Sequence, residues 1–256
     1  MEEPKEFSFE TEAGAEGTLP YPPEVVWKAI TNESETTHWL GVIGYWPADP
    51  APGKRFWTRS TGLGYMAFEY LEFTPPRRLK ARGLYTGRVF TWELQRVDGG
   101  TRLRVSVQPG PNDTKWETDQ DHNSIGPVID IRNLRSYLKG DYDAQRFPFF
   151  GVRTKPLSPE SPNVQVVTEV YAWASAAGLR VGDKIVSVNG EEIPRSPFSF
   201  APLYWLARKH RAGETVTLTV HRENKTLEMV LRLYSWREAA EAMGADIGPP
   251  PGFDRG

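Results

Sequence analysis

The chain has 256 residues, enough for two domains of ordinary size, and its 23 glycines and 22 prolines indicate many turns. Its formal net charge of −2 gives no reason to expect a protein that binds nucleic acid, and it has no cysteine, which excludes disulfides and thiol chemistry. No apolar run approaches the roughly 20 residues of a membrane-spanning helix, and the acidic start lacks the apolar segment of a secretory signal. We therefore expect a cytoplasmic protein without membrane insertion.

The first half of the chain predicts an antiparallel sheet covered by one long helix. A strand is expected over residues 7–17, followed by short helices over 22–30 and 33–40. Alternating apolar and polar residues then predict six half-buried strands over 42–46, 55–59, 65–73, 79–85, 89–96 and 102–107. Residues 124–139 carry an apolar stripe at helical spacing. Because a sheet with one apolar face needs a cover, we expect a curved sheet that grips this helix.

Five short motifs in this half resemble the SRPBCC (START-like, helix-grip) superfamily. They are Pro23-Glu24-Val25-Val26-Trp27, Trp39-Leu40-Gly41, Pro75-Pro76-Arg77-Arg78-Leu79, Gly99-Gly100-Thr101-Arg102-Leu103 and Leu134-Arg135-Ser136-Tyr137-Leu138. The resemblance covers about residues 6–140 and is closest to the branch related to activators of the heat-shock chaperone ATPase. It implies a cavity between the sheet and the long helix, which in many members holds a lipid, sterol or polyketide.

Aromatic side chains are concentrated in this half, which holds six of the nine tryptophans. Ligand cavities favour rigid aromatic walls with a few polar groups. One interpretation is therefore that a set of aromatic residues lines the cavity: Trp39, Trp57, Tyr65, Phe68, Tyr70, Phe90 and Trp92. The alternative is that aromatic residues fill the core, which we favour for Trp27 and Trp92.

The second half of the chain has the pattern of a small β-rich domain. Strands are expected over residues 164–171, 184–189, 215–221 and 226–233, with a helical turn at 174–179 and a helix at 200–210. Ser235 and Glu238 have the spacing of a capping box, which predicts a short helix that ends near Met243.

This half resembles a PDZ domain of the bacterial type that follows heat-stress serine proteases. The resemblance covers about residues 146–234, and its most specific part is a long string with correct spacing. The residues that carry it are Phe150-Gly151-Val152, Ala174-Ser175-Ala176-Ala177-Gly178-Leu179-Arg180-Val181-Gly182-Asp183-Lys184-Ile185, Val188-Asn189-Gly190 and Ala212-Gly213-Glu214-Thr215-Val216.

The PDZ resemblance implies that an extended peptide adds as a strand to an open sheet edge, beside a helix. Backbone N–H groups of the loop 149–151 would converge on the peptide's terminal carboxylate. The expected peptide-binding residues are Phe149, Phe150, Gly151, Val152, Pro202, Leu206 and Lys209. For the groove helix, the set one residue earlier is an alternative: Ala201, Trp205 and Arg208. A PDZ domain that only docks on its neighbour is a further alternative.

Motifs for catalysis and for metal or cofactor binding are absent from the sequence. The four histidines share no metal-ligand spacing, and neither a phosphate-binding loop nor a G-x-S-x-G nucleophile motif is found. We therefore expect no catalytic residue, no metal and no cofactor.

These observations predict an α+β protein with a helix-grip domain at residues 1–140, a PDZ domain at 141–236 and a flexible tail at 237–256. We expect a non-enzymatic adaptor that binds protein C-termini or peptide segments, with an apolar small molecule or a chaperone as a possible partner of the first half. One alternative is a cyclase- or hydrolase-like enzyme that works inside the helix-grip cavity, which a cavity-facing cluster of Asp, Glu, His or Arg would support. Another is a co-chaperone that regulates an ATPase.

Overall fold

An eight-stranded antiparallel sheet forms the framework of residues 1–144. The computed structural model describes the chain except residues 1–2, 10–11, 41, 61–63, 112, 114–119, 147, 159, 162, 195–205, 207–208, 245–249, 251–252 and 255–256. It divides the chain into two units, one of residues 1–144 with 247–256 and one of residues 145–246. Each unit is described by itself below. None of the helices in the described ranges is long and apolar enough to cross a membrane.

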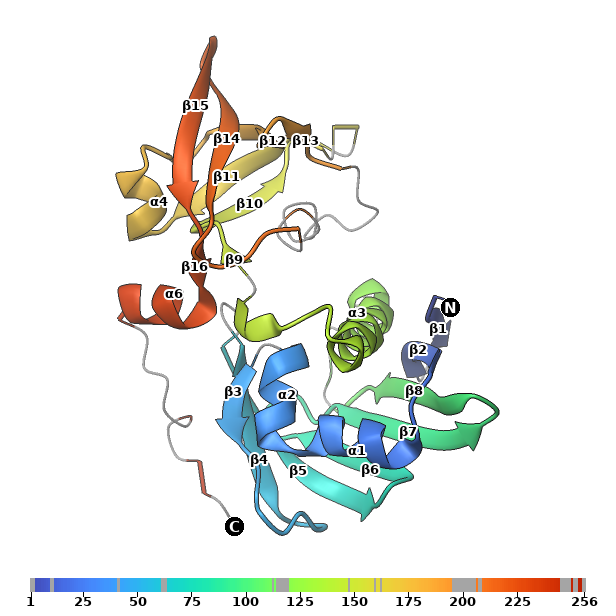
Figure 1. Cartoon of the computed structure of the whole chain (residues 1–256). Helices are drawn as coiled ribbons and strands as arrows, with labels where there is room; N and C mark the ends of the chain where they lie inside the picture. Colours follow the sequence, from blue (N-terminus) through green and yellow to red (C-terminus); the bar gives the residue numbers. More distant parts are fainter. Residues whose placement is uncertain are drawn as a thin grey trace. The chain divides into compact units, whose positions relative to one another are not determined.

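The sheet of the first unit has the strand order β1-β2-β8-β7-β6-β5-β4-β3 (Figure 1). Its strands are β1 (Lys5–Phe9), β2 (Glu12–Leu19), β3 (Val42–Tyr45), β4 (Arg55–Ser60), β5 (Gly64–Thr74), β6 (Arg78–Gly83), β7 (Val89–Val97) and β8 (Gly100–Gln108). Three helices accompany it: α1 (Pro23–Thr31), α2 (Glu33–Leu40) and α3 (Gln120–Lys139).

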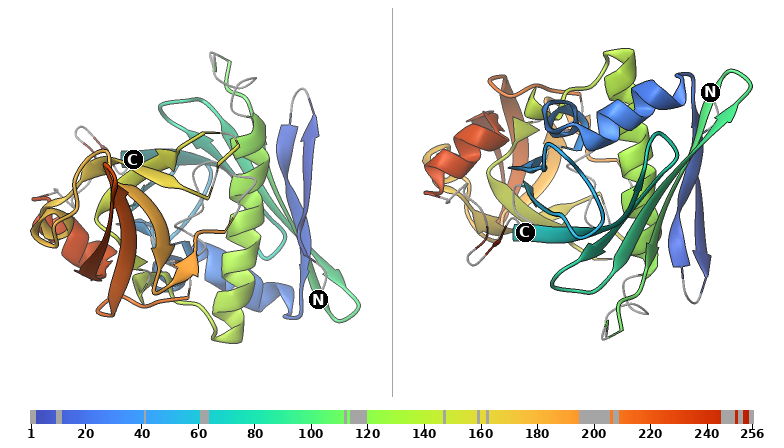
Figure 2. Two further views of the ribbon diagram at one scale, coloured as in Figure 1. Left: turned by 90° about the horizontal axis from the view of Figure 1, so that it is seen from above. Right: turned by 90° about the horizontal axis from the view of Figure 1, so that it is seen from below.

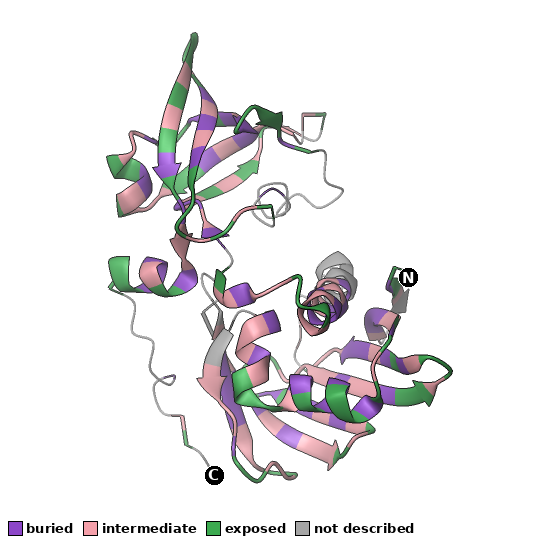
Figure 3. Ribbon diagram, in the orientation of Figure 1, coloured by how far each residue is buried: buried purple, intermediate pink, exposed green. Residues whose placement is uncertain are grey.

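The long helix α3 packs on the sheet, which curves around it (Figure 2). Ile131 and Leu134 of α3 are almost fully buried against Leu103 and Val105 of β8 and the rest of one contiguous core. Buried and exposed residues alternate along the strands in Figure 3, because successive strand side chains point to opposite faces. The helix-grip arrangement expected from the sequence is therefore present.

The single strand expected over residues 7–17 is two strands. β1 and β2 pair antiparallel, with Phe7 opposite Gly14, and their connection at residues 10–11 lies outside the described residues. No glycine, proline or asparagine marks a turn between Phe9 and Glu12, so the sequence pattern carries no signal for this break.

The second unit is built on a six-stranded antiparallel sheet with the order β10-β11-β12-β14-β15, in which β13 pairs with β12. Its strands are β10 (Val152–Pro156), β11 (Gln165–Val170), β12 (Lys184–Val188), β13 (Glu191–Glu192), β14 (Thr215–Arg222) and β15 (Lys225–Arg232). A separate two-stranded sheet joins β9 (Pro148–Phe149) to β16 (Tyr234–Ser235). Its described helices include α4 (Ala172–Ala176) and α6 (Trp236–Ala242), and the short helix η1 (Ala144–Arg146) lies at the boundary of the two units. With both units, the chain is α+β, as predicted.

An ion pair between Asp183 and Arg222 stabilises the turn at residues 180–183. Asp183 is 1% exposed and accepts hydrogen bonds from the Arg180 N–H at 2.9 Å and from Arg222 Nε at 2.7 Å. Arg222 also donates to the Gly178 carbonyl at 2.7 Å. The end of β14 is thereby joined to the loop between α4 and β12.

The helix α6 begins with the predicted capping box. The Ser235 hydroxyl accepts from the Glu238 N–H at 3.2 Å, and the Glu238 carboxylate accepts from the Ser235 N–H at 2.8 Å. Ala239 and Ala240 are 1% and 5% exposed, so the first residues of the expected tail form a packed helix. The predicted helix over 200–210 lies mostly outside the described residues.

Candidate functional site

A cavity of about 130 Å³ lies inside the first unit. It is lined by side chains from α1, α2 and α3 on one side and from strands β4 to β7 on the other. The lining residues are Ile30, Thr36, Trp39, Leu40, Trp46, Phe56, Thr58, Met66, Phe68, Tyr70, Leu79, Phe90, Trp92 and Asp130. Its position between sheet and helices is the one expected for a helix-grip cavity.

Stacked aromatic rings form the sheet side of this cavity. Phe56 of β4 lies opposite Phe68 of β5, and their ring centroids are 4.8 Å apart. Tyr70 is two residues after Phe68, so it projects from the same face of β5 and stacks on Phe56 at 4.6 Å. Phe90 of β7 meets Phe68 edge-on at 5.5 Å. The alternation of side chains along neighbouring strands thus builds one continuous aromatic wall.

Two polar groups of the cavity wall have no partner in the described part of the chain. Thr58 is 3% exposed, and its Oγ1 atom is buried without a hydrogen bond. Burial raises the pKa of Asp130 to about 7, and no hydrogen bond or charge from the described residues acts on its carboxyl group. Burial also raises the pKa of the Tyr70 hydroxyl, which stays protonated. The cavity is therefore apolar in the main, with a buried, unsatisfied hydroxyl at Thr58 and a half-buried carboxyl group without a described partner at Asp130.

A second candidate site lies in the second unit, at the loop that joins β9 to β10. β9 is held by pairing with β16, and the Gly151 carbonyl accepts from the Tyr171 N–H at 2.8 Å. Gly151 has φ +72°, a conformation that favours glycine. The N–H groups of Phe150 and Gly151 donate to none of the described residues. β10, which follows directly, is the terminal strand of its sheet.

Two family matches cover most of the chain. Residues 20–129 match the family described as activator of Hsp90 ATPase homolog 1-like protein (AHSA1), and residues 148–233 match the PDZ domain. The chain carries an AHSA1-like SRPBCC domain followed by a PDZ domain. Both resemblances drawn from the sequence are therefore confirmed.

Solved structures similar to the chain cover about half of it. A protein from Rhodobacter sphaeroides is 21% identical with a TM-score of 0.46, over 54% of this chain and 99% of that chain. Protein MLL2253 from Mesorhizobium loti is 23% identical with a TM-score of 0.43, over 49% of this chain and 94% of that chain. The Aha1 dimer from Colwellia psychrerythraea is 16% identical with a TM-score of 0.39, over 49% of this chain and 94% of that chain. No curated protein matches the chain.

The structure brings together most of the aromatic residues expected in the cavity of the AHSA1-like domain. Those that line it are Trp39, Phe68, Tyr70, Phe90 and Trp92. Trp57 is not among them: it follows Phe56 in β4 and therefore projects from the opposite face, although it is buried at 7% exposure. The side chain of Tyr65 lies outside the described residues. Phe56, Trp46 and Asp130 also line the cavity but were not expected there from the sequence. Tertiary packing decides which face of β4 and which side of α3 point into the cavity.

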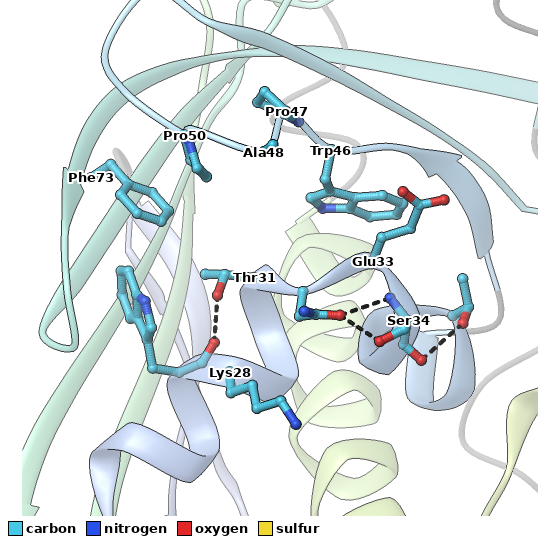
Figure 4. A pocket seen from close by; sticks show the side chains of 12 residues that line it. Lys28, Thr31, Glu33, Ser34, Trp46, Pro47, Ala48, Pro50 and Phe73 are labelled. Atoms are coloured by element: carbon cyan, nitrogen blue, oxygen red, sulfur yellow. Dashed lines mark hydrogen bonds between the residues drawn. The ribbon is translucent and has the colours of Figure 1, made fainter.

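A larger cleft of about 760 Å³ lies outside this cavity, and Trp46 lines both (Figure 4). It is formed by the corner between α1 and α2 and by the segment 46–50. Several of its polar groups are paired with one another: Thr31 Oγ1 donates to the Trp27 carbonyl at 2.8 Å, and Asn32 Oδ1 accepts from Ser34 N at 2.9 Å and Ser34 Oγ at 2.6 Å. Of the described residues that line either space, Thr58 of the inner cavity has a buried polar atom without a partner.

The residues expected to bind peptide are only partly brought together in the PDZ domain. Residues 149–152 form the loop and the start of β10, with Phe149 paired to Tyr234 and Phe150 buried in the core. Leu206 is also a core residue, at 1% exposure, and Lys209 forms an ion pair with Glu191. Pro202 and the alternative set Ala201, Trp205 and Arg208 lie outside the described residues, so the choice between the two helix registers stays a prediction.

Proposed function

We propose that the protein is a non-enzymatic adaptor whose PDZ domain binds the carboxyl terminus of a partner peptide. The observation that carries this proposal is the pair of N–H groups at Phe150 and Gly151, which donate to no described residue although both residues are buried. Adjacent backbone donors in a tight turn make a nest for an anion. A peptide carboxylate would satisfy them with charge-assisted hydrogen bonds.

The adjoining strand supplies the second element of peptide recognition. β10 begins at Val152, directly after the loop, and its outer edge pairs with no described strand. A peptide whose carboxylate sits at Phe150 and Gly151 can therefore continue antiparallel along β10 and complete its ladder. Main-chain bonding of this kind gives affinity with little dependence on sequence, so selectivity would come from the groove helix.

For the AHSA1-like domain, the aromatic-lined cavity favours a second role, the binding of a small, mainly apolar molecule. A cyclase or hydrolase would need several acidic, basic or nucleophilic groups facing the substrate. Of the lining residues that the structure describes, Asp130 alone carries a formal charge, and no group of three or more potential metal ligands occurs in the described ranges. Both observations support a binding role over catalysis.

Fluorescence anisotropy of the full chain tests the PDZ proposal. The probe is a fluorescein-labelled pool of peptides with random internal residues and a terminal valine, and its matched control is the same pool with an amidated terminus. Each charge-assisted bond to the carboxylate contributes about 1.5–3 kcal/mol. We expect the amidated pool to bind at least about tenfold more weakly, since about 1.4 kcal/mol is a factor of ten. Equal binding of the two pools would contradict the proposal.

A further inference from the structure

The cavity of the AHSA1-like domain contains a carboxyl group without a counter-charge. No lysine, arginine or histidine is among its described lining residues, and Asp130 and Tyr70 are the only lining groups that titrate. Burial raises the pKa of Asp130, and none of the described residues contributes a charge or hydrogen bond that offsets this shift. An ionised Asp130 is therefore destabilised in the empty cavity, and a ligand that brings a positive charge would remove this cost.

The aromatic rings that line the cavity also favour a positively charged ligand. The faces of aromatic rings carry negative electrostatic potential and attract cations, with Trp the most effective. The rings that line the cavity are Trp39, Trp46, Phe56, Phe68, Tyr70, Phe90 and Trp92. A desolvated cation over an uncovered ring face is stabilised, which favours an organic ammonium ion over a neutral molecule of the same shape.

The size of the cavity limits the ligand further. At about 130 Å³ it is slightly smaller than an engineered protein cavity of about 150 Å³ that accommodates benzene. A lipid or sterol therefore does not fit, whereas a compact ammonium ion with one short substituent does. Thr58 Oγ1, buried without a partner, is available for a hydroxyl or N–H group on that substituent.

We propose that this cavity binds a small organic ammonium ion of about the size of choline, with its positive charge facing Asp130 and its polar substituent bonded to Thr58. The proposal rests on the ligand-binding role proposed above for the AHSA1-like domain and specifies the chemical class of the ligand. The carboxylate supplies charge, the rings supply shape and cation contacts, and the threonine hydroxyl supplies orientation.

Calorimetric titration of the full chain with two matched probes tests the proposal. Choline carries the charge, and 3,3-dimethylbutan-1-ol is its neutral isostere with the same number of non-hydrogen atoms. We expect choline to bind at least about tenfold more tightly than the alcohol to the unaltered protein. Asp130→Asn should abolish this preference and leave the affinity for the alcohol within about threefold. Glu33→Gln is the matched control, because Glu33 is an exposed carboxylate that lines the outer cleft.

The pH dependence gives a second readout in the unaltered protein. Choline has no titrating group, so its affinity should rise between pH 6 and pH 8 as Asp130 ionises, while the affinity for the alcohol stays constant. Equal affinities of the two probes, or a choline affinity indifferent to Asp130→Asn, would overturn the ammonium proposal and leave a cavity for neutral ligands. Binding of neither probe would contradict both the ammonium proposal and the ligand-binding role. The peptide measurement on the PDZ domain is independent of either result.

Discussion

The indole of Trp173 occupies the space beside the α-carbon of Gly151. A Cβ atom on Gly151 would lie 2.5 Å from Trp173 Nε1 and 2.6 Å from Cε2, well inside van der Waals contact. Trp173 in turn stacks between Tyr171, with centroids 5.6 Å apart, and Tyr234, at 4.7 Å. The conformation of the proposed carboxylate loop is therefore supported by a stack of three aromatic rings from two separate segments of the PDZ domain.

We predict that Gly151→Ala destabilises the PDZ domain. A methyl group there meets the Trp173 ring, and φ of +72° is strained for any residue with a Cβ, so the expected loss is about 1–3 kcal/mol of unfolding free energy. Because part of this loss is the contact with the ring, Trp173→Leu in the same chain should recover some of it. Urea denaturation of both single variants and the double variant measures the coupling. Strict additivity would show that the ring does not constrain the loop.

A second prediction concerns the ion pair of Asp183 and Arg222. Burial opposes ionisation of Asp183, but hydrogen bonds from Arg222 and the Arg180 N–H outweigh it and hold its pKa below the ordinary range. Arg222→Ala leaves a buried carboxylate unpaired and should lower the unfolding free energy by about 3 kcal/mol at pH 7. The control is Arg232→Ala, which removes an exposed pair with Glu238 and should change little.

The sign of the pH dependence follows from this lowered pKa. The stabilisation from Asp183 is complete above about pH 4, the ordinary range of the group in an unfolded chain, and is lost as the pH falls through the lower pKa of the folded state. The difference in unfolding free energy between the unaltered protein and Arg222→Ala should therefore become smaller as the pH is lowered. A difference that grows at low pH would contradict this account of the pair.

Asp130 should give the opposite pH dependence. Its pKa of about 7 lies above its ordinary value of about 4, so the folded state holds a proton that the unfolded chain has released. Stability from this group is complete at low pH and falls between about pH 4 and pH 7, by at most about 1.4 kcal/mol per pH unit. Thermal unfolding of the unaltered protein and of Asp130→Asn across this range measures it. If the stability of the two proteins changed with pH in the same way, the carboxyl group of Asp130 would be solvated.

The sequence predicts most of the local structure because the relevant signals are local. Gly182 and Asp183 belong to the string that carries the PDZ resemblance, and the structure shows Asp183 bonded to the Arg180 N–H within the same string. Ser235 and Glu238 form their capping box from four neighbouring residues. Phe68 and Tyr70 share a face because they are two residues apart in a strand.

The composition of the cavity depends on packing that no local pattern contains. Phe56 and Trp57 are adjacent aromatic residues in β4, and only the pairing with β5 decides that Phe56 faces the cavity. Asp130 lies outside the apolar stripe of its helix, where a solvent-exposed position is the ordinary expectation, yet it lines the cavity. Tertiary contacts therefore set the chemistry of the site, while the sequence pattern sets its framework.

The central claim, that the PDZ domain binds a peptide carboxylate at the loop after β9, is tested most directly by the backbone amide resonances of Phe150 and Gly151. Titration of the full chain with a peptide that ends in a free valine carboxylate should move both amide protons downfield, because each gains a charge-assisted hydrogen bond. The same peptide with an amidated terminus should leave them nearly unmoved. Shifts of equal size with both peptides, or shifts confined to residues outside the loop and β10, would contradict the account.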